Sequence, residues 1–215
     1  MTELRVHNFS LSLDGYAAGP TQDVAHPLGV GREHVHEWIF APEGERTPAD
    51  DRMQAPGTGG TGGAIMRRTM FGPVRDGWGE AEEWCGWWGE EPPFHHDVFV
   101  LTHHPRGPLP TAGGTTFHFV TDGIEAALER ARAAADGLAV RLGGGVDTVQ
   151  QYLRAGLLDE LHLVVVPVLL GSGERLFAHL DGALDGWRCA EFAPSATVTH
   201  VRLRPWSMGF ETIGT

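Results

Sequence analysis

The sequence contains no lysine: all 16 basic residues among its 215 positions are arginines. Schiff-base chemistry, attachment of pyridoxal phosphate and the phosphate-binding lysine of a P-loop each need a lysine ammonium group, so the sequence excludes them. The 28 acidic residues outnumber the arginines and give a net charge of −12. Because this charge repels phosphate backbones and anionic lipid, we expect neither nucleic acid nor a membrane surface as a partner.

Cysteine is scarce, and long apolar runs are missing. Cys85 and Cys189 lack the CxxC spacing of zinc or redox sites, so we expect two free thiols. The longest apolar run, LHLVVVPVLLG, is short and interrupted by Pro167, so it cannot cross a bilayer. The first residues also lack the basic and apolar regions of a signal peptide. The sequence therefore predicts a cytoplasmic protein.

The first part of the chain predicts one strand followed by a long loop. Alternating apolar residues indicate a strand from about Leu4 to Leu13, which ends at the turn-forming pair Asp14-Gly15. Residues 17–63 are rich in proline and glycine, which predicts little regular structure and a functional loop excursion. No linker divides the chain, so we expect a single domain over residues 1–215.

The remainder alternates between strand and helix patterns and ends in two successive strands. Together these patterns predict an α/β fold with a mixed, mostly parallel sheet, flanking helices and antiparallel C-terminal strands. The predicted strands lie at 63–66, 98–102, 115–121, 139–143, 159–170, 187–193 and 196–205, and the helices at about 124–135 and 146–156.

One stretch, VRLGGGVDTVQQYLRAG, runs from a strand through three glycines into a helix. Such a turn brings free backbone N–H groups and the positive end of the helix dipole to one point, where a phosphate can approach closely. The stretch does not match GxGxxG, and no acidic ribose ligand follows at the expected distance. The residues alone leave two interpretations open: a phosphate-binding loop, or a tight turn.

A longer pattern surrounds these glycines: the triplet, a helix, GLxDEL, a strand and PVxLGxGxxLF, over residues 141–177. This pattern resembles the reductase domain of bacterial riboflavin biosynthesis and its dihydrofolate-reductase-like relatives. The segments SLSLDGYAAGP and VFVLTHHPR fit the same family, so the resemblance covers most of the chain. It implies a mixed sheet with helices on both faces and NADPH bound across the carboxyl ends of the central strands.

The resemblance also implies which residues bind NADPH. The pyrophosphate and the nicotinamide ribose would contact Gly143, Gly144, Gly145 and Thr148. The 2′-phosphate would contact Thr102, His103 and His104, with the positive charge of Arg106 nearby.

A further segment, IMRRTMFG, would place the start of a helix at the cofactor phosphates through Arg68 and Thr69. The family usually has a glycine where this chain has Arg67. The arginine side chain either crowds the pyrophosphate or supplies a second cation to it.

The family resemblance predicts NADPH-dependent hydride transfer to a small planar heterocycle or a carbonyl or imine metabolite. The alternative is a non-catalytic binding protein that has kept the fold and lost cofactor use. Asp14 is the candidate proton donor, because hydride transfer requires an acid near the nicotinamide; its other interpretation is a turn residue. We also expect a homodimer that forms through apolar strands and the Trp-rich loop.

Histidine and tryptophan are both abundant, and each allows two interpretations. No histidine spacing matches a metal motif such as HExxH, so no metal site is expected. His34 and His36 either line a substrate pocket or lie at the surface. Four tryptophans either pack in the core or form a flat wall for a planar ligand; they are Trp78, Trp84, Trp87 and Trp88.

Overall fold

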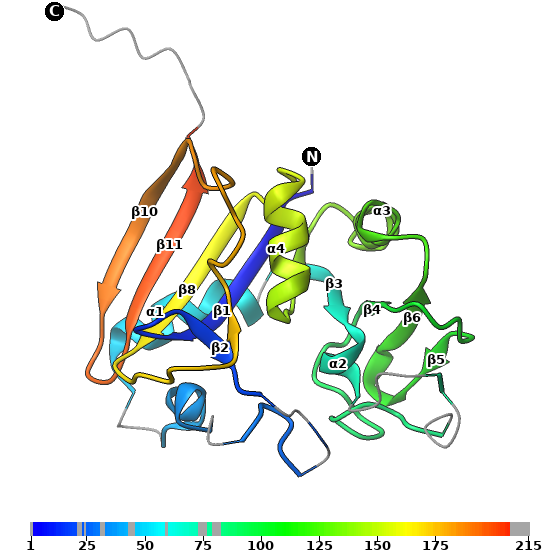
Figure 1. Cartoon of the computed structure of the whole chain (residues 1–215). Helices are drawn as coiled ribbons and strands as arrows, with labels where there is room; N and C mark the ends of the chain where they lie inside the picture. Colours follow the sequence, from blue (N-terminus) through cyan, green and yellow to red (C-terminus); the bar gives the residue numbers. More distant parts are fainter. Residues whose placement is uncertain are drawn as a thin grey trace, which may run out of the picture.

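The structure, a computed structural model, describes residues 2–20, 23, 25–30, 33–42, 46–58, 60–72, 77–78 and 83–206. Its centre is a nine-stranded sheet with the order β10-β11-β8-β1-β7-β3-β4-β6-β5 (Figure 1). A separate two-stranded sheet pairs β2 (Tyr16–Ala18) with β9 (Glu174–Arg175). The strands of the large sheet are β1 (Leu4–Ser12), β3 (Thr61–Arg67), β4 (Asp97–Leu101), β5 (Leu109–Pro110), β6 (Thr116–Val120), β7 (Ala139–Leu142), β8 (Glu160–Val166), β10 (Trp187–Pro194) and β11 (Thr199–Pro205).

The strand pairing confirms the predicted mixed sheet. The six central strands β8, β1, β7, β3, β4 and β6 run parallel to one another. At the edges, β11 pairs antiparallel with both β8 and β10, and β5 pairs antiparallel with β6. The carboxyl ends of the parallel strands therefore share one edge of the sheet. The predicted strand at 159–170 is shorter than expected, because β8 ends just before Pro167, which cannot donate to the strand ladder.

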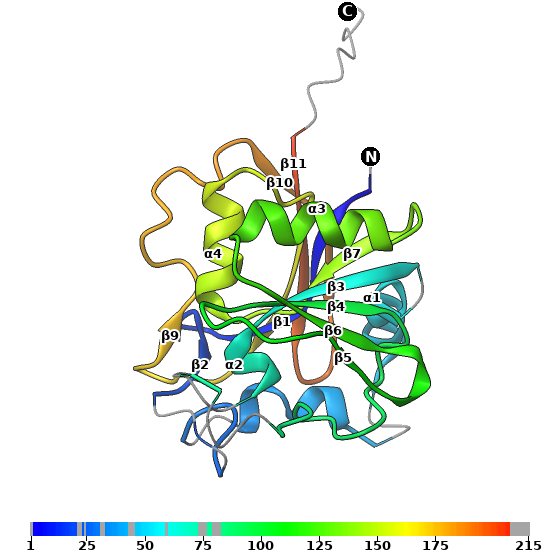
Figure 2. The ribbon, with the colours of Figure 1, turned by 90° about the vertical axis from the view of Figure 1, so that its right-hand side faces the viewer.

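Helices α3 (Ile124–Ala134) and α4 (Val146–Arg154) cover one face of the sheet (Figure 2). The predicted apolar stripe of α4 is buried: Val146, Val149 and Leu153 are exposed by 5%, 0% and 3%. None of the helices that the structure describes is long and apolar enough to span a membrane.

The predicted loop excursion at 17–63 is wrong in part, because it contains the helix α1 (Pro48–Thr58) and the 3-10 helices η1 (Glu33–Val35) and η2 (Glu37–Phe40). The start of α1 is a capping box. Thr47 Oγ1 accepts from the N–H of Asp50, and the Asp50 carboxylate accepts from the N–H of Thr47. Pro48 then occupies the first helical turn, where its missing N–H is harmless.

A buried histidine chain, formed by His7, His162, His200 and Asp50, joins α1 to the opposite face of the sheet. His7 Nε2 donates to the carbonyl oxygen of Gln54 in α1 at 3.1 Å, and its Nδ1 lies 3.3 Å from His162 Nδ1. His162 Nε2 lies within hydrogen-bond distance of His200 Nδ1, at 3.1 Å, and His200 Nε2 donates to Asp50 Oδ1 at 2.9 Å. The imidazoles thus hold two points of α1 against β1, β8 and β11.

The other half of that face is covered by aromatic side chains. Phe71, at the end of α2 (Arg68–Phe71), packs edge-on against Trp78, Phe117 and Phe119. Trp84 donates from Nε1 to the carbonyl oxygen of Phe71 at 3.0 Å. Part of the predicted Trp-rich loop, residues 79–82, lies outside the described residues. Trp78, Trp84 and Trp88 pack against apolar residues of β3, β4 and β6, so this part of the segment contributes to the core of the protein.

Candidate functional site

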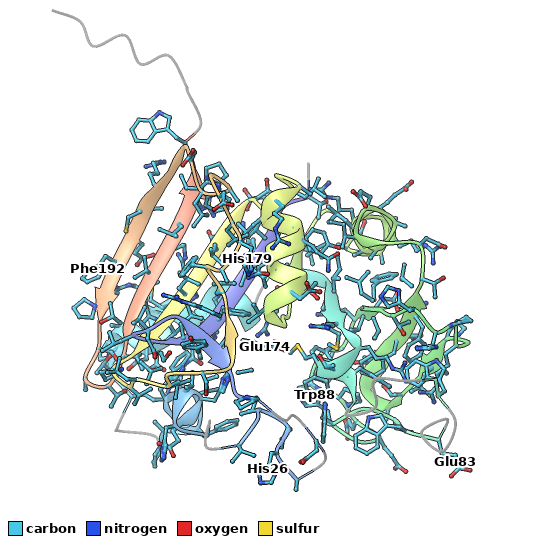
Figure 3. All side chains as sticks on the ribbon, viewed as in Figure 1. His26, Glu83, Trp88, Glu174, His179 and Phe192 are labelled. Atoms are coloured by element: carbon cyan, nitrogen blue, oxygen red, sulfur yellow. The ribbon has the colours of Figure 1, made fainter. Side chains whose placement is uncertain are left out.

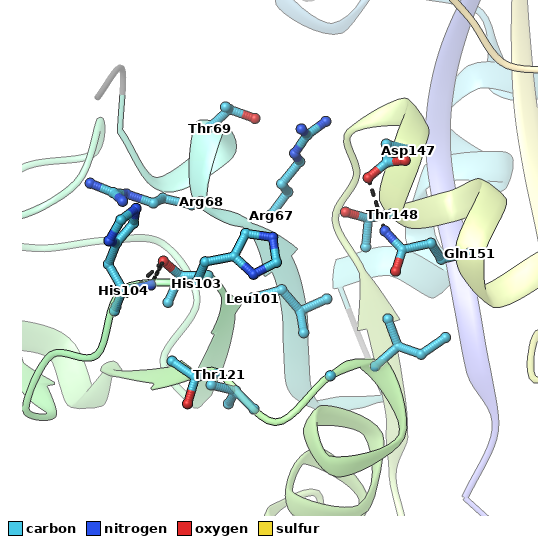
Figure 4. Close-up of a pocket in the computed structure, with 14 residues that line it drawn as sticks. Arg67, Arg68, Thr69, Leu101, His103, His104, Thr121, Asp147, Thr148 and Gln151 are labelled. Carbon is cyan, nitrogen blue, oxygen red and sulfur yellow. Dashed lines mark hydrogen bonds between the residues drawn. The ribbon is translucent and has the colours of Figure 1, made fainter. Parts of the chain in front are cut away.

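A pocket of about 210 Å³ opens at the carboxyl ends of β3, β4 and β6 and beside the start of α4; we call it the arginine pocket (Figure 4). It brings together six of the nine residues for which the sequence predicted cofactor contacts. These are Arg68, Thr69, Thr102, His103, His104 and Thr148.

Two arginines give this pocket its positive charge. The guanidinium of Arg68 is buried and lies over the ring of Trp78, 4.0 Å from its centroid. Arg67 also lines the pocket, and its side chain has no hydrogen bond or ion pair with any residue that the structure describes. Its guanidinium faces the space between α2 and α4 (Figure 4). An available cation at this place favours an anionic ligand.

The start of α4 adds backbone donors to the same pocket. Gly145 is the N-cap residue and offers no side-chain hydrogen bond, so no side chain from that position occupies the N–H groups of the first turn. Thr148, which lies in this turn, is only 1% exposed. Orphan N–H groups, a helix dipole and Arg67 together form an arrangement that suits phosphate oxygens.

The glycine triplet links β7 to α4, and its members differ in backbone conformation and in the space available for a side chain. Gly144 has a φ of +113°, a conformation that only glycine adopts without strain. Gly145 has a φ of −45°, and a Cβ there would lie 3.8 Å from Arg67 Cδ and 3.9 Å from Glu174 Oε2. The turn interpretation thus explains Gly144, whereas the φ of Gly145 lies in a range that other residues also adopt.

The triplet lines a second pocket of about 410 Å³, which we call the aromatic pocket. Its walls come from β1, η2, α2 and the segment that carries Trp87 and Trp88. Thr69 lines both pockets, which therefore adjoin. Figure 3 shows Glu174 and Trp88 on opposite sides of this space. The apolar wall residues include Phe9, Phe40, Met70, Trp87 and Trp88.

An irregularity in β1 shapes this pocket. The register of β1 against β8 shifts between Val6 and Phe9, and Asn8 has a positive φ of 57°. Such a bulge re-aims the side chains beside it, and both Asn8 and Phe9 line the aromatic pocket. Sequence alternation alone gave no sign of the bulge.

Asp14 lines neither pocket. Its carboxylate accepts hydrogen bonds from Ser12 Oγ at 2.6 Å and from the backbone N–H groups of Leu170 and Gly171, the latter at 2.7 Å. The Ser12 hydroxyl and these amides lower the pKa of Asp14 to about 2. The geometry favours its interpretation as a turn residue, because an ionised carboxylate cannot donate a proton.

The other candidate residues separate into pocket and surface positions. His36 lines the aromatic pocket, where burial lowers its pKa, whereas His34 is exposed and pairs with Glu37 at 2.8 Å. Arg106, whose charge was expected near the 2′-phosphate, does not line the arginine pocket. It donates to the carbonyl oxygen of Trp84 at 2.9 Å and lies over aromatic rings. Among the residues described, no group of histidine, cysteine and acidic side chains could hold a metal ion.

The cysteines and tryptophans likewise take separate places. Cys85 and Cys189 are both free. Trp87 and Trp88 line the aromatic pocket, and Trp78, Trp84 and Trp88 pack against the core. Both interpretations of the tryptophans therefore apply, and Trp88 fits both of them.

A model of the RibD C-terminal domain family matches residues 6–200 of this chain. The chain belongs to this family. The resemblance inferred from the glycine triplet and its flanking motifs is thereby confirmed. A search of curated proteins finds no match.

Solved structures extend the comparison to the fold of the RibD C-terminal domain. A putative riboflavin biosynthesis protein from Shewanella sp. PV-4 is 20% identical, with a TM-score of 0.60, and the match covers 95% of this chain and 98% of that one. Dihydrofolate reductase from Enterococcus faecalis, complexed with NADP(H) and RAB-propyl, is 14% identical, with a TM-score of 0.55 and coverage of 94% and 95%. Both share the dihydrofolate-reductase-like fold with this RibD C-terminal domain.

Proposed function

We propose that this protein is an NADPH-dependent reductase that transfers a hydride to a small planar heterocycle or to a carbonyl or imine metabolite. The observation that carries the proposal is the meeting of a cationic pocket and an aromatic pocket at one glycine-rich turn. A dinucleotide has a charged phosphate part and a flat ring, which match these two environments. Membership of the RibD C-terminal domain family supports the same activity.

The residues of the arginine pocket fit the phosphates of NADPH. Arg67, the first turn of α4 and the hydroxyl of Thr148 would hold the pyrophosphate, while Thr102, His103 and His104 would contact the 2′-phosphate. Arg68 and Thr69 begin α2 at the same place. NADPH, when bound, would supply the hydride.

The aromatic pocket would orient the substrate and exclude water. Trp87, Trp88 and Phe9 supply flat apolar surface, which holds a planar ring and lowers the local dielectric. Glu174 and His36 are the titratable side chains among its described lining residues, so a proton from solvent would be relayed to the substrate through them rather than donated by Asp14. We propose the cytoplasm as the place of this chemistry, which remains a prediction from the sequence.

We predict that replacing His104 by alanine weakens NADPH binding about tenfold and leaves NADH binding within about twofold, because only NADPH carries the 2′-phosphate. NADPH titration, followed by energy transfer from tryptophan and by thermal melting, measures both affinities. His34→Ala is the matched control, because His34 is exposed and lies outside both pockets. Equal losses for both cofactors would refute the 2′-phosphate role.

Turnover separates the reductase from its non-catalytic alternative. A reductase oxidises NADPH in the presence of an acceptor, which the loss of absorbance at 340 nm reports. A sequestering protein would bind a planar ligand tightly in the aromatic pocket without oxidising NADPH. This alternative is supported by the position of Asp14, the predicted proton donor, which lines neither pocket.

We also propose a homodimer. The Trp-rich loop packs against its own core, so the expected interface moves to the apolar strands. Phe192 on the edge strand β10 is 64% exposed and pairs in register with Val201.

Light scattering at micromolar concentration should give twice the chain mass of 23.3 kDa, and Phe192→Asp should halve the measured mass. Leu138→Asp, at another exposed apolar position, should not change it. A single-chain mass for the unmodified protein would contradict the proposal.

A further inference from the structure

The two adjoining pockets differ in the sign of their charge. The arginine pocket contains Arg67 and Arg68, with Asp147 as its only carboxylate among the lining residues. The aromatic pocket contains Glu174 as its only formally charged group among the lining residues that the structure describes. Burial lowers the pKa of His36, which therefore adds no positive charge there at neutral pH.

Gly145 lies at the boundary between these charges. A Cβ at this residue would be 3.8 Å from the stem of Arg67 and 3.9 Å from Oε2 of Glu174. Arg67 lines only the arginine pocket and Glu174 only the aromatic pocket. The two side chains therefore lie on either side of one glycine, and each lines a different pocket. The described contacts include no ion pair between them.

Local structure holds Glu174 at the pocket wall. The residue pairs with Ala18 across the small sheet of β2 and β9, and its side chain is half-buried. Alternation along β9 sends the neighbouring Arg175 the other way, over the ring of Tyr16. Within the described part of the chain, the Glu174 carboxylate makes no hydrogen bond or ion pair.

The segment that follows β9 is itself fixed to α4. Nε2 of Gln150, which is 8% exposed, lies within hydrogen-bond distance of three carbonyl oxygens, those of Arg175, Leu176 and Ala178, at 3.1, 2.8 and 3.0 Å. This attachment fixes the backbone next to Glu174. The Glu174 carboxylate thus lies beside aromatic walls on a fixed backbone. Because it has no partner among the described residues, it is available to a ligand.

We propose that the aromatic pocket selects an uncharged or cationic planar heterocycle that donates an N–H hydrogen bond to Glu174, and rejects phosphorylated or carboxylated compounds. This inference rests on the proposed function for the identity of the pocket as the substrate site. An anion in this pocket would face an unpaired carboxylate, and the described residues that line this pocket include no cation to offset it, since Arg67 lines the other pocket. An amino-heterocycle instead satisfies that carboxylate. Phosphate groups are directed instead to the arginine pocket.

A matched pair of probes tests this selection: 2-aminobenzimidazole, which donates N–H groups, and benzimidazole-2-carboxylate, which has a similar shape and a negative charge. Quenching of tryptophan fluorescence should show at least about tenfold tighter binding of the amino compound. Glu174→Gln keeps the size of the side chain and removes its charge, so the preference should fall below about threefold. Glu129→Gln, at an exposed position on α3, should keep the full preference.

Three outcomes would each overturn the charge selection. The two probes could bind equally to the unmodified protein, the amino compound could fail to bind at millimolar concentration, or the preference could be unchanged in Glu174→Gln. Trp87→Leu should weaken both probes together, which locates them in the aromatic pocket; an unaffected affinity would place them elsewhere and also overturn it. NADPH titration of the same proteins gives a separate answer. Probe selection without NADPH binding would refute the reductase and leave the charge selection supported.

Discussion

Lowering the pH from 7 to 4.5 is expected to remove about 5 kcal/mol of folding stability through two buried histidines. Burial lowers the pKa of His7 to about 4 and that of His162 to about 2, from an ordinary value of 6.5. Below pH 6.5 these two histidines therefore bind protons in the unfolded chain but stay neutral in the folded chain, so the stability of the fold decreases as the pH falls. Each histidine contributes about 2.7 kcal/mol at two pH units below its unfolded pKa.

The partner carboxylate does not offset this loss. Burial of Asp50 opposes its ionisation, but hydrogen bonds from His200 and Thr47 outweigh burial and lower its pKa to about 2. Asp50 consequently stays ionised in both states across the same pH range. The expected loss is comparable with the whole stability of many domains, so unfolding should begin well above the pH at which the carboxylates titrate.

Urea unfolding at intervals from pH 7 to 4.5 measures this dependence as the free energy of unfolding. His162→Gln should reduce the slope of the unfolding free energy against pH by the equivalent of about one proton, because glutamine fills the position without titrating. His34→Gln makes the same chemical change at an exposed histidine and should leave the slope as it is. A His162→Gln slope equal to that of the unmodified protein would show that the histidine chain is not the cause.

Replacing Gly145 by alanine is expected to weaken NADPH binding at least about tenfold, or 1.4 kcal/mol. The added methyl group would occupy the gap beside Arg67 Cδ and Glu174 Oε2, next to the N–H groups that would receive the pyrophosphate. The negative φ of this residue accepts alanine, so unfolding should change by no more than about 1 kcal/mol from the altered helix cap.

The neighbouring Gly144 is a poorer position for this test. Its φ of +113° and the 3.3 Å approach of Phe9 Cε2 would add folding strain to any effect on the cofactor. Gly107→Ala is the control, because a Cβ there meets nothing within 4 Å. NADPH titration and denaturant unfolding of the same variants separate affinity from stability. Full affinity in Gly145→Ala would mean that the triplet serves only the turn.

The elements with strong periodicity could be predicted from the sequence. The apolar stripe of α4 follows from its spacing, and β8 is rich in apolar residues because other layers cover both of its faces. Helix α1 was missed because its proline suggested a loop. Its start signal, a threonine followed by proline and by an aspartate three residues after the threonine, is present in the sequence but lies within a segment rich in proline and glycine.

The candidate site was predictable only where motifs follow strand ends. The family resemblance singled out Thr102, His103 and His104, and they line the arginine pocket because parallel strands place their carboxyl ends at one edge. The bulge at Asn8 depends on pairing with a strand more than 150 residues later, and Glu174 reaches the pocket only through the small sheet with β2. Neither long-range pairing leaves a local pattern in the sequence. The histidine chain similarly joins residues from four separate segments.

The three contacts of Gln150 have a mechanical consequence for the aromatic pocket. They join α4 to residues 175–178, so the glycine triplet at one end and Glu174 at the other belong to one stiff body. The opposite wall comes from separate segments, with Phe40 in a short 3-10 helix and Trp87 and Trp88 in a turn. We therefore expect that a wider ligand would displace the aromatic wall, while the polar wall would keep its geometry.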